Sequence, residues 1–176
     1  MLSNRFSKLA AYNRWANARL YAAALELPEA LYRQPTDVFF SDLHGTLNHL
    51  LLTDRMWLAR LTGDGEQPAR LDLILYEDRK ELTRARIGED ERIIALAGGY
   101  DEQELDQLHS YLTTSGQPQQ QPLCDILSHL FNHQAHHRGQ AHACLSILTQ
   151  RKPPSLDLLA YQRGAPAPNL ATLLHS

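Results

Sequence analysis

Apolar residues recur at three- and four-residue steps in four long stretches of the chain, which is the period of an amphipathic helix. The first stretch covers residues 4–27, and either Ser3 or Asn4 is a suitable N-cap for it. The second covers residues 41–61, where we expect Ser41 to be the N-cap. These two stretches predict the first two long helices.

Two further stretches with the same period follow. The third covers residues 73–96 and is rich in charge, and its run RKELTRARIGEDERI predicts a solvent-exposed helix face. The fourth begins at Pro122, which suits the first turn of a helix because its missing N–H costs nothing there. It continues with apolar residues at helical spacing until Pro153, and it is the clearest helix prediction in the chain.

Residues 100–121 lack a sustained period. They predict a short acidic helical turn followed by an extended or irregular connection, and residues 156–161 predict a short helix. Four amphipathic helices with little strand signal indicate an all-α protein, a four-helix bundle in which the 100–121 connection permits a long crossover. We expect one domain over residues 1–163 and a loosely held tail over residues 164–176.

Composition narrows the possible functions. Hydrophobic residues make up 43% and charged residues 21%, as in ordinary globular proteins, and the formal net charge of −3 offers no basic surface for nucleic acid. No apolar run approaches a signal peptide or a membrane span. Cys124 and Cys144 form no CxxC pair, so a reducing cytoplasm is the expected compartment.

Histidine is the unusual feature, because five of the nine histidines fall within fourteen consecutive residues of the fourth predicted helix. They are His129, His133, His136, His137 and His142. At 100° per residue, His133 and His137 lie within the apolar stripe of that helix. His129 and His136 lie on the edge of the stripe, and His142 lies opposite it, where we expect solvent.

Two histidines four residues apart on a helix can bind one ion, with metal–nitrogen bonds of about 2.0–2.1 Å. A single inward histidine is more often neutral and hydrogen-bonded, but two facing imidazoles are harder to satisfy without a shared metal. The second predicted helix offers His44 and His49 as a third ligand, and periodicity does not choose between them. Three histidines without a carboxylate leave coordination positions for water or substrate, which favours a catalytic site.

The string NHQAHHRGQAH at residues 132–142 resembles the signature of the DinB/YfiT-like superfamily, a DNA-damage-inducible group of metal-binding proteins. YNRWANARL at residues 12–20 and TLNHLLLTDRMWLARL at residues 46–61 are similar to segments of the same family. The resemblance implies a four-helix bundle with a long crossover. It also implies a divalent metal, zinc or nickel, held by one histidine of the second helix and two of the last. The matching residues here are His49, His133 and His137, so the resemblance selects His49 over His44.

Similar proteins include S-transferases that use a low-molecular-weight thiol and a mycothiol-dependent isomerase. The resemblance therefore implies a metal-dependent enzyme, a transferase or one that is hydrolase-like, in which the metal activates a thiol or water for a small-molecule substrate. It also implies a homodimer. The alternative is a non-catalytic, stress-induced metal-binding protein.

A few other polar residues have candidate roles. We expect Asn13 and Asn17 to make helix-packing contacts, and Cys144 and Trp57 to be buried in the core. Gln140 points inward on the helical wheel. It is either a hydrogen-bond partner of a ligand imidazole or part of an interhelical hydrogen bond.

Overall fold

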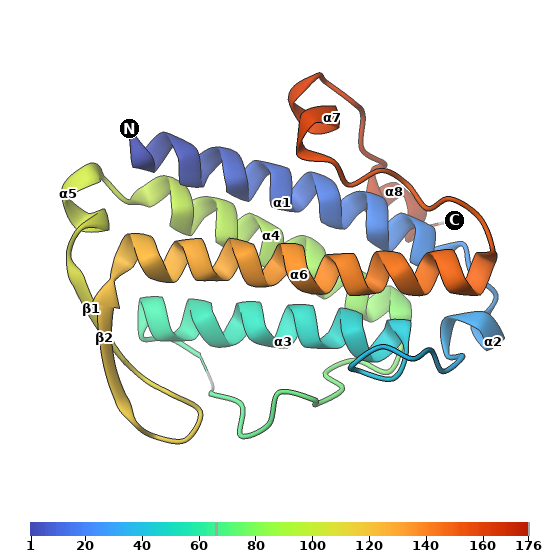
Figure 1. Ribbon diagram of the computed structural model, residues 1–176, viewed down its shortest axis with the longest axis horizontal. Coiled ribbons are helices and arrows are strands. Elements are labelled where there is room, and N and C mark those ends of the chain that lie inside the picture. Colours follow the sequence, from blue (N-terminus) through green and yellow to red (C-terminus); the bar gives the residue numbers. More distant parts are fainter. Residues whose placement is uncertain (66, 176) are drawn as a thin grey trace.

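The computed structural model describes residues 1–65 and 67–175, and four long helices dominate it (Figure 1). These are α1 (Leu2–Leu25), α3 (Leu43–Thr62), α4 (Arg79–Gly99) and α6 (Leu123–Thr149). The shorter elements are α2 (Glu29–Tyr32), α5 (Glu102–Leu105), β1 (Leu108–Leu112), β2 (Pro118–Pro122), α7 (Leu158–Gln162) and α8 (Leu170–Leu173). The all-α bundle predicted from the sequence is confirmed. No helix in the described part of the chain has the length and apolarity needed to cross a membrane.

The four long helices form a bundle in which α1 packs on α4 and α6, and α3 packs on the same two helices from the other side. Helices α1 and α6 run in one direction, whereas α3 and α4 run in the other (Figure 1). Because α3 and α4 are parallel, the chain between them must return along the bundle, and residues 67–78 do so beside α3. The long crossover thus lies there, and the expectation that residues 100–121 form it is wrong. That segment stays at one end of the bundle as α5 and an antiparallel hairpin, in which β1 pairs with β2.

Helix α3 begins one residue later than a cap at Ser41 would place it. Its N-cap is Asp42, whose side chain accepts a hydrogen bond from the backbone N–H of Gly45. Ser41 has a φ of 68°, in the left-handed region, and belongs to the preceding turn. Both residue types favour N-cap positions, but the turn leaves only Asp42 in the extended conformation that a cap needs.

Helix α4 begins after Asp78, so the predicted start at Leu73 is too early. The backbone N–H groups of Leu75 and Tyr76 both donate to Asn48 Oδ1 on α3, at 2.9 and 3.0 Å. This contact holds the segment against α3 as a loop, although its apolar residues continue the helical period. Asp78 then caps α4.

The core has two apolar clusters, one toward each end of the bundle. Trp57 lies in one and Cys144 in the other, and both side chains are buried as predicted. The tail was expected to be loosely held, whereas Leu170 of α8 is only 6% exposed and packs in the same cluster as Cys144. Helix α8 contacts both α1 and α4.

A buried charged layer separates the two apolar clusters along the helices, and all four long helices contribute to it. Its members are Asn13, Asn17, Asp54, Arg86, Asp90, Gln134 and Arg138, which we call the polar layer. Arg86 Nη1 donates to Asp54 Oδ2 at 2.6 Å, and its Nη2 lies 3.1 Å from Asp90 Oδ1. The prediction of a solvent-exposed charged face on α4 is therefore wrong for Arg86, Glu89 and Asp90, each of which is at most 2% exposed.

Candidate metal centre

Three histidines converge at the contact between α3 and α6. His49 comes from α3, and His133 and His137 come from successive turns of α6. One ring nitrogen from each lies within 4.8 Å of the other two. The ring centroids of His133 and His137 are 4.3 Å apart, and those of His49 and His137 are 4.4 Å apart. The structure thus brings together the three residues that the family resemblance selected, and we call them the histidine triad.

Hydrogen bonds fix the tautomers of two of these imidazoles. His49 Nδ1 lies 2.7 Å from the carbonyl oxygen of Leu71, and because a carbonyl only accepts, Nδ1 must carry the proton. His137 Nδ1 lies 2.7 Å from Gln140 Oε1, which likewise accepts. In a neutral imidazole the other nitrogen then has no proton, so Nε2 of both His49 and His137 presents a lone pair.

These two lone pairs face each other. His49 Nε2 and His137 Nε2 are 3.3 Å apart, and with both protons on Nδ1 no hydrogen bond can form between them. Two nitrogens bound to one tetrahedral ion, with bonds of about 2.05 Å, would lie about 3.3 Å apart. The geometry and the donor type therefore both fit a shared metal ion.

The imidazoles of the histidine triad are neutral at neutral pH, which is the state in which histidine binds a metal ion. Burial lowers the pKa of His49 to about 4. Burial, reinforced by the neighbouring imidazoles of His137 and His49, lowers the pKa of His133 to about 3. Burial also lowers the pKa of His137, against the opposing effect of the hydrogen bond that its Nδ1 donates to Gln140. At neutral pH no proton has to be displaced from these imidazoles before they coordinate a cation.

Comparison of the sequence with known protein families agrees with this geometry. A sequence model of the DinB family matches residues 1–170. The chain belongs to the DinB family. It is also similar to a curated relative, Protein DinB of Bacillus subtilis (strain 168), with 28% identity over 145 residues that cover 78% of this chain and 83% of the relative.

An aromatic side chain that the sequence analysis missed covers the triad of this DinB-family chain. The ring of Phe40 stacks on His49 with a centroid distance of 3.9 Å, and it lies 5.5 Å from the ring of His137. Phe40 reaches this position because its loop presses on the first turn of α3, where a Cβ on Gly45 would lie 2.6 Å from the Phe40 carbonyl oxygen. Neither Phe40 nor Gly45 lies in a motif that pointed to the site.

Four of the other histidines were also weighed as candidates or lie beside the triad. His44, the alternative to His49, is buried, and its Nδ1 lies 2.9 Å from the Tyr32 hydroxyl, away from the triad. His142 lies on the opposite side of α6, half-buried, with its Nε2 3.0 Å from the carbonyl oxygen of Pro154. His129 and His136 are exposed next to the triad, at centroid distances of 5.8 Å from His133 and 4.7 Å from His137.

Gln140 is the hydrogen-bond partner of a triad imidazole, which was one of the two roles considered for it. Its Oε1 accepts from His137, while its Nε2 lies 3.3 Å from Nε2 of His136. One amide therefore holds the orientation of His137 and ties it to the exposed neighbouring histidine.

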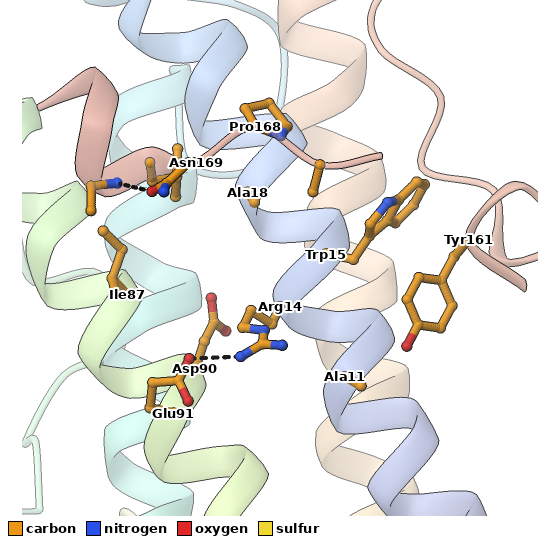
Figure 2. Close-up of a pocket in the computed structure, with 13 residues that line it drawn as sticks. Ala11, Arg14, Trp15, Ala18, Ile87, Asp90, Glu91, Tyr161, Pro168 and Asn169 are labelled. Carbon is orange, nitrogen blue, oxygen red and sulfur yellow. Dashed lines mark hydrogen bonds and ion pairs between the residues drawn. The ribbon is translucent and has the colours of Figure 1, made fainter. Parts of the chain in front are cut away.

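A cavity of about 490 Å³ lies away from the triad, between α1, α4 and the C-terminal segment. Figure 2 shows Trp15 and Tyr161 along one side of it, and an ion pair joins Arg14 of α1 to Glu91 of α4 at 2.8 Å. The carboxylate of Asp90 also lines this cavity, but it already accepts a hydrogen bond from Asn17 and pairs with Arg86. No triad histidine lines this cavity.

Proposed function

We propose that His49, His133 and His137 hold one divalent metal ion and that this ion forms a catalytic centre. The observation that carries the proposal is the pair of Nε2 atoms 3.3 Å apart, both left as acceptors by the hydrogen bonds at Nδ1, a pair that a shared metal ion would bridge favourably. Membership of the DinB family and the grouping of the three imidazoles support the same role. Imidazole donors suit zinc and nickel, and we propose one of these two ions.

The donor set favours catalysis over a purely structural role. Among the residues that the structure describes, the group contains three histidines and no carboxylate or thiolate, so a four-coordinate ion would keep one position for an exogenous ligand. A bound divalent ion supplies Lewis acidity, which lowers the pKa of a coordinated thiol or water. We propose a transferase or hydrolase-like activity on a small molecule, with a low-molecular-weight thiol as the candidate nucleophile.

The protein itself contributes orientation and shielding. The Leu71 carbonyl and the Gln140 amide accept from Nδ1 of His49 and His137, which keeps both Nε2 lone pairs directed at the same point. Phe40 covers one face of His49 and keeps water from that side. We expect exogenous ligands to approach along α6, where His129 and His136 are exposed next to the triad.

Metal analysis of untagged protein tests the site. We expect about one zinc or nickel ion per chain in the wild type and none in His49→Ala or in the double variant His133→Ala/His137→Ala. His142→Ala is the matched control, because it removes a histidine from the far side of the same helix. Circular dichroism establishes that each variant is folded. Equal metal content in the triad variants and the control would overturn the assignment.

A separate assay tests catalysis. Monochlorobimane or a similar electrophile is incubated with a panel of cellular thiols and the metal-loaded protein, with and without a chelator. We expect at least one thiol to give an adduct whose formation stops when the chelator removes the ion. If metal binds stoichiometrically and no thiol gives a metal-dependent adduct, the transferase proposal is wrong and the non-catalytic binding protein is the better description.

A further inference from the structure

A continuous row of rings leads away from the histidine triad along the contact between α3 and α6. The ring of His129 lies 5.8 Å from that of His133, and the ring of Trp57 lies 5.1 Å from that of His129. The row ends at Arg60, whose guanidinium carbon lies 4.6 Å from the Trp57 centroid and 5.3 Å from the Tyr111 centroid. This row of rings therefore joins the triad to one positively charged side chain, that of Arg60.

The charge of Arg60 has no counter-ion among the described residues. The Arg60 side chain makes no ion pair and donates no hydrogen bond there, and its buried Nε has no hydrogen-bond partner. Every other buried or half-buried arginine in the described ranges has a polar partner, such as Glu89 for Arg55 or Asp54 for Arg86. Burial lowers the pKa of Arg60, and the positive charge of Arg60 adds to burial in lowering the pKa of His129.

The spacing suits a small extended ligand. Arg60 follows His49 by eleven residues, which is close to three full turns, so both side chains lie on the same face of α3. Long helical side chains point back toward the N-terminus, and the contact of Arg60 with Trp57, one turn earlier, shows this direction. The distance from the triad to the guanidinium is thus on the order of 10 Å.

We propose that Arg60 is an anion-binding residue for the molecule that occupies the triad. The substrate or cosubstrate is then an extended small molecule with a metal-binding thiol at one end and a carboxylate at the other. A guanidinium binds a carboxylate through two parallel N–H···O bonds, and one unpaired arginine balances one carboxylate charge. This inference rests on the proposed function, because it requires that the thiol binds a metal at the triad.

A matched pair of thiols tests the proposal in protein loaded with cobalt(II), where a coordinated thiolate gives a charge-transfer absorption band. The probes are ω-mercaptooctanoate and ω-mercaptooctanol, which share the thiol and the eight-carbon chain and differ only in the terminal group. We expect the wild type to bind the carboxylate about tenfold more tightly than the alcohol. Arg60→Gln should abolish this preference and leave the affinity for the alcohol unchanged. Arg163→Gln, which removes an exposed arginine elsewhere, is the control and should keep it.

The outcomes separate the two proposals. Equal affinity of the wild type for both thiols, or an equal loss for both in Arg60→Gln, would mean that Arg60 only packs against Trp57 and Tyr111, and would overturn the anion site. The affinity for the alcohol also shows whether Arg60→Gln keeps an intact metal centre. Absence of a charge-transfer band with either thiol in the wild type would overturn thiol binding itself, and the role of Arg60 with it. Metal content measured beforehand would still decide whether the triad holds an ion.

Discussion

The histidine triad and the polar layer are neighbours in the same bundle, yet their buried polar groups are paired in different ways. Gln134 and Arg138 of the polar layer each follow a triad histidine directly in the α6 sequence, so the two sites share a helix and differ only in the face they use. In the polar layer most donors meet acceptors, and Nη2 of Arg86, which has no hydrogen-bond partner among the described residues, still pairs with the charge of Asp90. Arg138 donates to Asn13 and Gln134, and Gln134 donates to Asp54.

The triad has no such closure. Its outer N–H groups are satisfied by Leu71 and Gln140, but toward its centre His49 and His137 offer only lone pairs. The polar layer carries two carboxylates and two guanidiniums, and so its charges cancel internally. Burial of polar groups is therefore no indication of a ligand site by itself. The balance of donors and acceptors within the cluster separates a structural network from a site that awaits a cation.

The largest expected effect concerns the polar layer. Arg86→Met should lower the free energy of unfolding by about 3–5 kcal/mol, because it leaves Asp54 and Asp90 buried without their counter-charge. Metal content of the folded variant should stay at the wild-type level, since no triad contact is lost. Urea unfolding monitored by circular dichroism measures the change.

Arg84→Met is the control for this prediction. Arg84 lies on the same helix and pairs with Glu81, but both side chains are about half exposed. An exposed ion pair contributes at most about 1 kcal/mol, so this variant should unfold almost like the wild type. If both variants lost equally little stability, the polar layer would not be the self-contained structural unit described above.

The next effect concerns the triad, and here we expect a gain in stability when an ion is added. Because an ion would bind the folded chain and not the unfolded one, zinc at a thousandfold excess over its dissociation constant should raise the free energy of unfolding by about 4 kcal/mol. His49→Ala should lose this gain. Thermal melting of chelator-treated protein, with and without added zinc, measures it. A gain of the same size in His49→Ala would place the zinc elsewhere on the protein.

A smaller effect is expected at the edge of the triad. Gln140→Ala removes the acceptor for His137 Nδ1 and should weaken metal affinity about tenfold, because the imidazole is then free to change tautomer and rotate. Competition with a chromophoric chelator measures the affinity. Gln120→Ala, in the hairpin, should leave it unchanged. A Gln140→Ala variant with wild-type affinity would show that the contacts with α3 and Phe40 alone orient His137.

The helical period predicted the bundle well because each long helix buries one apolar stripe, and that requirement is local in the sequence. Helix ends depended on contacts that are not local. Asn48 holds residues 75 and 76 in a loop, although their spacing continues the period of α4. The crossover was assigned to the wrong connection because the length of a loop does not reveal whether the helices it joins run parallel.

The site was predictable in part. The helical wheel placed His133 and His137 together, and the family resemblance selected His49. The polar layer was not recognised, because a charged stripe such as that of Arg86 and Asp90 has the same period whether it faces water or partners on other helices. Phe40 and Arg60 gave no signal, since their importance lies in what they touch across the fold.

The smallest expected effect is a pH dependence that arises from His49 in the metal-free triad. The pKa of His49 is about 4 in the folded chain and ordinarily 6.5, so below pH 6.5 the unfolded chain binds a proton that the folded chain refuses. Stability is therefore complete above pH 6.5 and falls as the pH drops toward 4. At pH 5.5 the cost is about 1 kcal/mol. The difference in unfolding free energy between wild type and His49→Ala, in chelator-treated protein, should shift by that amount between pH 7.5 and 5.5. Both proteins contain the same polar layer, so its titration cancels in the comparison. A difference independent of pH would mean that burial does not lower the pKa of His49 in the folded chain.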